Sequence, residues 1–241
     1  MKPTRTLRLL NRCLGKALHR YHMIQDGDRI AVALSGGKDS LALMWLLNER
    51  RRRIPIDYEL FGVYIDLGFP ESFGEALKDY GTSLGYRMTV AHTDAGPIAH
   101  GPQNRENPCF LCARLRRRRL FETAAALNCS KIALGHNRDD IIETLFINMC
   151  YAGEISTMRP VQPFFKGRFT MIRPLLFADE KTLRQFAREQ RFPAFVNPCP
   201  TAGISKRAEI KNMLQTLYRS NPKIKGNIFR SMTNVRSEYL L

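Results

Sequence analysis

Residues 29–40 read RIAVALSGGKDS, and this stretch decides the fold. The apolar run at 29–34 predicts a short buried strand, and the leucines after residue 40 predict a helix over 39–48. Between the two lie Ser35, Gly36, Gly37, Lys38, Asp39 and Ser40. A glycine-rich turn that opens a helix presents backbone N–H groups and the positive end of the helix dipole to an anion. The stretch therefore predicts a strand, a phosphate-binding loop and a helix.

The side chains of this loop add to the same chemistry. Lys38 supplies a positive charge, Ser35 and Ser40 supply hydroxyl donors, and Asp39 suits a Mg²⁺ ion bound to phosphates. The residue order is neither G-x-x-x-x-G-K-[ST] nor G-x-G-x-x-G. The structural alternative is a Gly-Gly turn that only begins a helix. The position between strand and helix favours a pyrophosphate site.

Strands and helices alternate through the first two thirds of the chain. Further strands are predicted at 60–65, 88–91, 131–134 and 170–172, and helices at 70–84, 114–127 and 139–151. This alternation is typical of an α/β fold with a parallel sheet covered by helices on both faces. Ligands of such sheets bind at the carboxyl ends of the strands. Residues 92–108, rich in Gly and Pro, are predicted to form a long loop.

Three segments are predicted along the chain. Residues 1–25 hold no acidic residue and repeat leucine at helical spacing, which predicts a basic N-terminal helix. Residues 26–177 form the sheet domain, and residues 178–241 form a helical C-terminal segment.

A second loop, GHNRDD at 135–140, follows the predicted strand at 131–134. It places Gly135 and His136 on the same edge of the sheet as the first loop. The carboxylates of Asp139 and Asp140 suit a metal ion or a proton transfer beside a triphosphate. They also suit the first turn of a helix, where acidic side chains cap free N–H groups. Both interpretations can hold together, and Asp140 is a candidate catalytic residue.

Six cysteines indicate metal or redox chemistry rather than disulfides, because a chain of 241 residues can bury a core without them. Cys109 and Cys112 form a C-x-x-C, predicted to lie on a loop that leads into a helix. Without a second pair, a structural zinc site is disfavoured, while a redox pair and an iron–sulfur cluster stay open. Cys199 is either a third ligand or a buried thiol. The remaining cysteines are predicted to be small core residues: Cys13, Cys129 and Cys150.

The chain carries 38 Lys and Arg against 22 Asp and Glu, a formal net charge of +16. Such an excess predicts a polyanionic partner, with nucleic acid first and an anionic membrane surface second. The 44% hydrophobic content excludes a disordered tail protein, and no apolar run is long enough to span a membrane. The basic residues crowd the helix beside the C-x-x-C, where an RNA backbone is the expected partner of Arg114, Arg116, Arg117, Arg118 and Arg119.

The SGGKDS loop resembles the signature of the PP-loop ATP pyrophosphatase superfamily, which has the adenine nucleotide alpha hydrolase-like fold. The order of SGGKDS, PCFLCARLRR at 108–117, GHNRDD and IRPL at 172–175 resembles the TtcA family of tRNA 2-thiocytidine synthetases. The resemblance runs over most of the chain. It implies an enzyme that adenylates C2 of a loop cytosine, position 32, with ATP and Mg²⁺, and that then replaces the oxygen with sulfur.

The resemblance also implies a [4Fe–4S] cluster, with Cys109, Cys112 and Cys199 as its ligands. The family usually has another cysteine three residues before the last one, where this chain has Val196. Three ligands leave one iron open for sulfur, a soft ligand that suits iron. Further implications are tRNA as substrate, a cysteine desulfurase as sulfur donor and a cytoplasmic location, with a homodimer as one state that the sequence allows.

Three alternatives stay open at this point. A lysidine synthetase-like enzyme shares the loop but does not need the cysteines. A 2-thiouridine synthetase-like enzyme usually carries zinc-binding cysteines at both chain ends, which this chain lacks, and Lys where this chain has Arg116. A redox-sensing RNA-binding protein would use the C-x-x-C as a switch and would turn over no ATP.

Overall fold

The computed structural model describes residues 4–201, 203 and 206–239. The chain divides into two compact units, Met1–Asn137 with Arg159–Ala202 and Arg138–Met158 with Gly203–Leu241. The predicted segments 1–25, 26–177 and 178–241 place their boundaries elsewhere and include residues outside the described ranges. They stay a prediction.

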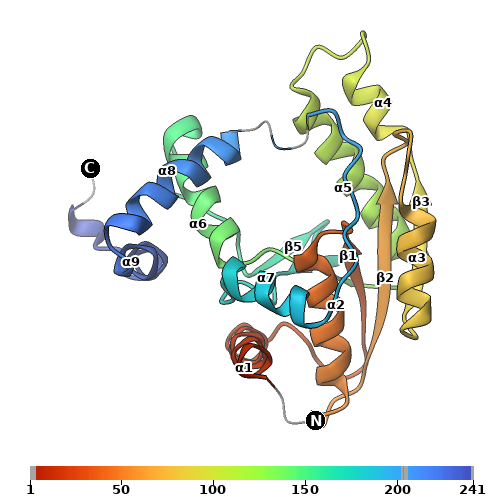
Figure 1. Ribbon diagram of the computed structural model, residues 1–241, viewed down its shortest axis with the longest axis horizontal. Helices are drawn as coiled ribbons and strands as arrows, with labels where there is room; N and C mark the ends of the chain where they lie inside the picture. The colour runs from red at the N-terminus through yellow and green to blue at the C-terminus, as the bar shows by residue number, and fades with distance from the viewer. Residues whose placement is uncertain (1–3, 202, 204–205, 240–241) are drawn as a thin grey trace. The chain divides into compact units, whose positions relative to one another are not determined.

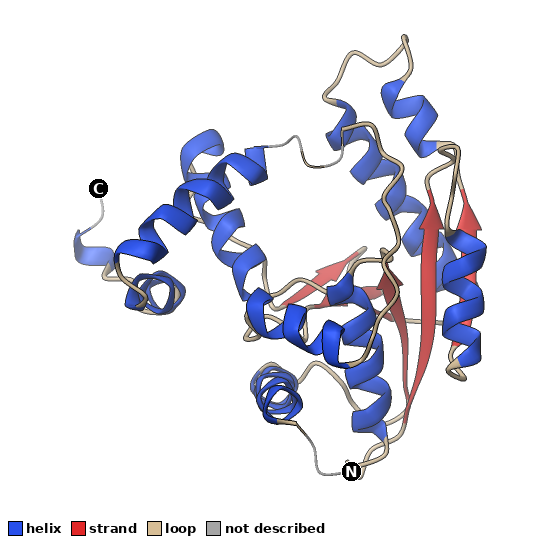
Figure 2. Ribbon diagram, viewed as in Figure 1, coloured by secondary structure: helices blue, strands red, loops and turns tan. Residues whose placement is uncertain are grey.

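The first unit is built on a six-stranded sheet with the order β3-β2-β1-β4-β6-β5 (Figures 1 and 2). All neighbouring strands are parallel except β5 and β6. The predicted α/β fold and its five strands are confirmed, and the antiparallel edge strand β5 was not predicted. The strands are β1 (Asp28–Leu34), β2 (Tyr58–Asp66), β3 (Arg87–His92), β4 (Lys131–Ala133), β5 (Val161–Phe164) and β6 (Phe169–Ile172).

Helices cover both faces of this sheet, as the alternation predicts. Successive strand side chains point to opposite faces, so β1 contributes to two cores. On one face, Ala31 of β1 packs in a cluster with Phe121 and Ala124 of α5 (Pro108–Ala126). On the other face, Leu34 lies with Met44 of α2 (Lys38–Arg51) and with residues of α3 (Gly74–Ser83).

The basic N-terminal helix is confirmed as α1 (Arg5–Arg20), which packs against α2 and α7 (Glu180–Glu189). Thr4 caps it by accepting a hydrogen bond from the N–H of Leu7. Leucines at helical spacing form its buried side, while its arginines face solvent. Thr6 donates to Glu189 at 2.8 Å, which ties α1 to the end of α7.

Two predicted loops contain helix. The segment 92–108 includes the short helix α4 (Ala95–His100), and α5 begins at Pro108, so Cys109 and Cys112 lie within its first two turns rather than on a loop. The reason is local. The side chain of Asn107 accepts hydrogen bonds from the N–H groups of Cys109 and Phe110, and a proline is favoured at the first helical position.

The second unit is helical. It comprises α6 (Arg138–Ile147), a π-helical turn (Asn148–Ala152), α8 (Lys206–Ser220), α9 (Lys223–Ser231) and a 3-10 turn (Ser237–Tyr239). Ile142 of α6 and Ile210 and Leu214 of α8 form its buried centre.

The three cysteines predicted to be core residues differ in exposure. Cys129 is buried in the sheet core and Cys13 is half-buried. Cys150 is exposed on the π-helical turn, so the prediction of a core position is wrong there. In the part of the chain that the structure describes, no helix combines the length and apolar character needed to cross a membrane.

Candidate functional site

The SGGKDS loop lies at the carboxyl end of β1, and α2 begins at Lys38. Its geometry is fixed from within by one hydroxyl. Ser40 Oγ donates to the carbonyl of Gly37 at 2.8 Å and accepts from the N–H of Ser35 at 3.1 Å. Ser40 is buried, so its hydroxyl holds the loop in shape. The prediction gave Ser40 a direct role toward phosphate, and these contacts add a structural one.

Gly36 occupies the tightest point of the loop. Its φ of 75° lies in the left-handed region, which only glycine adopts readily. A Cβ at this position would lie 2.6 Å from the ring of Phe73 and 3.0 Å from Cβ of Phe195. The loop therefore passes beneath two stacked aromatic rings, whose centroids lie 5.2 Å apart.

Lys38 and Asp39 contact each other and two residues from distant elements. Lys38 Nζ lies 3.1 Å from Asp39 Oδ2 and 3.3 Å from Oε1 of Glu180, the first residue of α7. Asn137 donates to Asp39 Oδ2 at 3.4 Å. The predicted phosphate lysine is thus held between two carboxylates. An incoming phosphate must compete with them, and a divalent cation at Asp39 would free the lysine to bind it.

The second loop packs directly onto the first. A Cβ at Gly135 would lie 3.0 Å from the backbone N of Ser40, so any other residue would press against the start of α2. The prediction that Gly135 and His136 share an edge with SGGKDS is consistent with this contact. Whether they bind nucleotide stays a prediction.

Arg173 is a buried residue that the sequence analysis did not select. Its Nε donates to Nδ1 of His136 at 3.3 Å, and its Nη atoms donate to Gln162 and to the carbonyl of Arg159. Burial lowers the pKa of Arg173 to about 10, and the charge of Arg117 adds to the effect. Arg173 stays charged at neutral pH and orients the His136 ring, with Nδ1 as the acceptor. The only sequence signal was an arginine directly after an apolar strand.

The acidic residues of the second motif lie in the second unit and have basic partners there. Lys225 Nζ lies 2.6 Å from Asp139 Oδ1. Arg207 Nη1 lies 3.6 Å from Asp140 Oδ1 and 3.1 Å from Glu143 Oε2. Burial raises the pKa of Glu143, and Asp140 raises it further, while Arg207 opposes both. These contacts tie α6 to α8 and α9, and the catalytic role of Asp140 stays a prediction.

Two of the three predicted ligand cysteines meet at one hydroxyl. Oγ1 of Thr201 lies 3.6 Å from Sγ of Cys109 and 3.3 Å from Sγ of Cys199, although the two cysteines are 90 positions apart in the sequence. His100, the last residue of α4, places Nε2 3.8 Å from Sγ of Cys199. Thr201 and His100 were not predicted, because only the fold brings them to the cysteines.

Cys112 lies one helical turn after Cys109, so both face the same side of α5. Burial raises the pKa of the Cys112 thiol, Arg116 opposes this, and Cys199 and Cys109 add to it. Metal binding to these thiols would release their protons.

The cysteine geometry does not suit a single metal ion. Among residues 4–201, 203 and 206–239, no three His, Cys, Asp or Glu side chains are close enough together to hold one. A four-iron cube binds each thiolate at a different iron, so its ligands stand farther apart than those of one ion. A set of three soft thiolate donors, two of them sharing one hydroxyl neighbour, fits such a cluster.

The chain links the cysteines to the nucleotide loop. The segment after α7 runs past the start of α2 toward the start of α5 (Figure 1). Phe195 in this segment packs over Gly36, and Cys199 follows four residues later. The same chain segment therefore covers the phosphate loop and carries Cys199, the third predicted ligand cysteine.

The five arginines of α5 differ in their partners. Arg114 binds Glu106 through two hydrogen bonds, at 3.0 and 3.1 Å. Arg118 and Arg119 both contact Glu122. Within the described ranges, the two that have no carboxylate partner are Arg116 and Arg117, both exposed. The protein itself thus supplies an anion to three of the five arginines.

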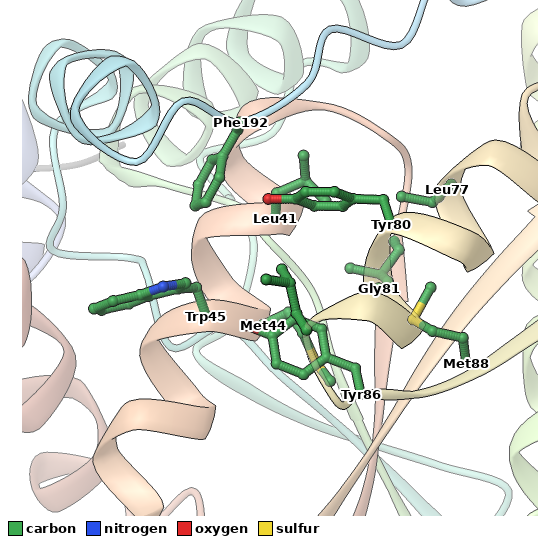
Figure 3. A pocket seen from close by; sticks show the side chains of 11 residues that line it. Leu41, Met44, Trp45, Leu77, Tyr80, Gly81, Tyr86, Met88 and Phe192 are labelled. Atoms are coloured by element: carbon green, nitrogen blue, oxygen red, sulfur yellow. The ribbon is translucent and has the colours of Figure 1, made fainter.

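Two cavities are described in the first unit. An apolar cavity of about 10 Å³ between α2 and α3 is bounded by the rings of Tyr80, Tyr86 and Phe192 (Figure 3), and it is too small for a nucleotide. A second cavity of about 360 Å³ is lined by Asp28 and Tyr58, the first residues of β1 and β2. It lies at the amino ends of the strands, opposite the predicted site.

Comparison with known proteins gives the family. Residues 8–216 match the model of the PP-loop domain. The chain is 38% identical over 235 residues to a tRNA-cytidine(32) 2-sulfurtransferase of Geobacter sulfurreducens, covering 96% of this chain and 91% of the relative. It is also 38% identical to the enzyme of the same name from Geotalea uraniireducens, over 97% and 94% of the two chains.

A solved structure supports the fold. The U34-tRNA thiolase NcsA from Methanococcus maripaludis, solved with its [4Fe–4S] cluster, superposes with a TM-score of 0.79 at 24% identity. The match covers 95% of this chain and 78% of that one. The domain match and the identity over nearly the full chain therefore give one result: the chain belongs to the PP-loop family of the tRNA-cytidine(32) 2-sulfurtransferases.

Proposed function

We propose that this chain is an ATP-dependent tRNA sulfurtransferase that converts cytidine 32 of tRNA to 2-thiocytidine. The observation that carries the proposal is that Cys109 and Cys199 both contact Thr201. Cys199 and Thr201 belong to the chain segment whose Phe195 also covers Gly36 of the phosphate loop. The near full-length identity to relatives named for this reaction supports the substrate. A redox switch or a lysidine synthetase would not require this coupling of three thiols to a nucleotide loop.

In the first step, the loop would bind ATP. The N–H groups at the start of α2 and the ammonium of Lys38 would hold the phosphates, with Asp39 holding Mg²⁺ and Asp140 as a second candidate acid. The C2 oxygen of the cytosine would attack the α-phosphorus and pyrophosphate would leave. The oxygen then becomes part of a good leaving group, because AMP departs far more readily than hydroxide.

In the second step, sulfur replaces that oxygen. Cys109, Cys112 and Cys199 would hold a [4Fe–4S] cluster, which supplies a site for sulfur at the iron that no cysteine binds. Attack of sulfide on C2 forms the C–S bond, and breaking of the C–O bond releases AMP. We expect a cysteine desulfurase to provide the sulfur in the cytoplasm, and Arg116 and Arg117 to contact the tRNA backbone.

The decisive experiment is mass spectrometry of nucleosides from tRNA incubated with the cluster-loaded protein, ATP-Mg²⁺ and sulfide. We expect 2-thiocytidine with the wild type and none with Lys38→Met. The matched control is Lys78→Met, which removes an exposed lysine of α3 that pairs only with Glu75 in the described residues. Thiocytidine formed without ATP, or none formed by the wild type, would overturn the proposal.

A further inference from the structure

Phe110 is a large apolar side chain that the fold leaves in solvent. It stands between the two cysteines of the C-x-x-C, in the first turn of α5, and its side chain is 62% exposed. A single exposed ring is common on protein surfaces and by itself indicates nothing. What distinguishes Phe110 is the set of groups around it.

The exposed ring continues into a basic stripe. Phe110, Arg114 and Arg117 are spaced at i, i+4 and i+7, so they line one side of α5. The guanidinium of Arg114 lies 5.7 Å from the centroid of the ring and is fixed by its two hydrogen bonds to Glu106. Arg117, one turn further, is exposed and has no carboxylate partner within residues 4–201, 203 and 206–239.

The adjacent side of the same helix carries the sulfur site. Cys109, Cys112 and Arg116 are spaced at i, i+3 and i+7, and Phe110 is one residue from the first of them. An aromatic face, two arginines and two of the proposed cluster ligands thus lie close together on the same helix.

We propose that the ring of Phe110 is the stacking platform for the cytosine that is thiolated, with Arg117 on the adjoining phosphate. The proposal rests on the proposed function, because it names the surface where that substrate base would lie. Enzymes that act on a base remove it from its stack, and an aromatic side chain replaces the lost stacking. A cytosine lying flat on this ring would present its edge, including C2, toward the neighbouring cysteines.

The size of the effect follows from known base–aromatic stacking. Loss of one stacking contact weakens binding of single-stranded RNA by about 5- to 150-fold. We therefore expect Phe110→Leu, which keeps an apolar side chain but no ring face, to weaken the binding of an anticodon stem-loop within this range. Phe110→Trp should bind at least as tightly as the wild type.

The test uses a stem-loop RNA with a fluorescent cytidine analogue at position 32 and cluster-loaded protein. Stacking on an aromatic ring quenches such an analogue, so the wild type and Phe110→Trp should quench it and Phe110→Leu should not. Equal visible absorption of the variants shows equal cluster content. Phe165→Leu is the matched control, because Phe165 is 63% exposed in the turn between β5 and β6.

Two results would overturn the inference. One is quenching and affinity of Phe110→Leu equal to those of the wild type. The other is a lower molar mass of Phe110→Leu than of the wild type in light scattering, with unchanged RNA affinity per monomer. The ring would then contact a second copy of the chain rather than a base. The fluorescence signal reports binding and needs no reaction product. Failure of this inference is therefore distinguishable from failure of the proposed function, in which the wild-type protein would form no thiocytidine.

Discussion

Gly36 offers the sharpest test of the phosphate loop. Two features of Gly36 should lower the stability of Gly36→Ala. One is its φ of 75°, and the other is the Phe73 ring, which lies 2.6 Å from the position that a Cβ would take. Gly27 makes it possible to separate them. It has almost the same φ, 76°, but a Cβ there would meet nothing within 4 Å among the described residues.

The expected magnitudes follow from this pair. A non-glycine residue in the left-handed region costs about 1 to 2 kcal/mol, and this cost applies to both Gly27→Ala and Gly36→Ala. Overpacking against a fixed ring adds about 1 to 3 kcal/mol, and this applies to Gly36→Ala alone. The free energy of unfolding should therefore be lower by about 1 to 3 kcal/mol in Gly36→Ala than in Gly27→Ala. The double variant Gly36→Ala, Phe73→Leu should recover part of this difference.

Urea denaturation measures the stability difference, and titration with an ATP analogue measures the effect on the loop. Gly27→Ala should keep its nucleotide affinity, because Gly27 precedes β1 at the opposite edge of the sheet. Gly36→Ala should lose affinity, because the loop must move away from Phe73. Equal stability of the two variants, or unchanged affinity in Gly36→Ala, would refute the geometry described for the loop.

Three more predictions test buried charge and the cysteines. Burial raises the pKa of Glu143, so the folded protein keeps the carboxyl proton at a pH where the unfolded chain has lost it. The free energy of unfolding should therefore fall as the pH rises from the ordinary carboxyl range through the raised pKa. Urea titrations of Glu143→Gln should lack this pH dependence. Arg173→Met should lower the free energy of unfolding by about 1 to 3 kcal/mol, measured in urea, because buried acceptors lose their donor. Cys199→Ser should lose visible cluster absorption, whereas exposed Cys150→Ser should keep it; equal absorption in the two variants would exclude Cys199 as a ligand.

The parts of the fold that were predictable are those with local signals. The run RIAVAL, the two glycines and the leucines after Ser40 are contiguous, and each favours the structure it adopts. Strand β5 was missed because it is a four-residue edge strand that contains Pro163, and proline is tolerated in a sheet only at such edges. Helix α4 was missed because it has six residues and includes Gly96 and Pro97.

One missed boundary did have a signal. Asn107 followed by Pro108 is a helix start, with a capping side chain and then a residue that needs no N–H partner. The polar composition of 92–108 concealed it. The consequence matters for the site, because a helix fixes the spacing of Cys109 and Cys112 on one face, whereas a loop would leave it variable.

The candidate site divides in the same way. Its contiguous motifs were visible in the sequence, but the residues that shape them come from elsewhere in the chain. Glu180 reaches Lys38 across 142 positions, and Thr201 reaches Cys109 across 92. Arg173 contacts His136 across 37 positions. Such contacts depend on tertiary packing, and a single sequence carries no periodicity that encodes them.

The net charge of +16 shows why a count of charges does not locate a binding surface. The run Arg114–Arg119 appears in the sequence as one uncompensated patch, but Glu106 and Glu122 neutralise part of it within the fold. A cation that is paired with a carboxylate must give up that partner before it can bind a phosphate, so it contributes less to RNA binding than an unpaired cation. Arg116 lies on the side of α5 that carries the cysteines, and Arg117 lies on the side that carries Phe110. Neither has a carboxylate partner among the described residues, and the two flank the position proposed for the base. The α5 arginines without a carboxylate partner among the described residues are therefore far fewer than the net charge suggests, and they lie on the same helix as Cys109 and Cys112.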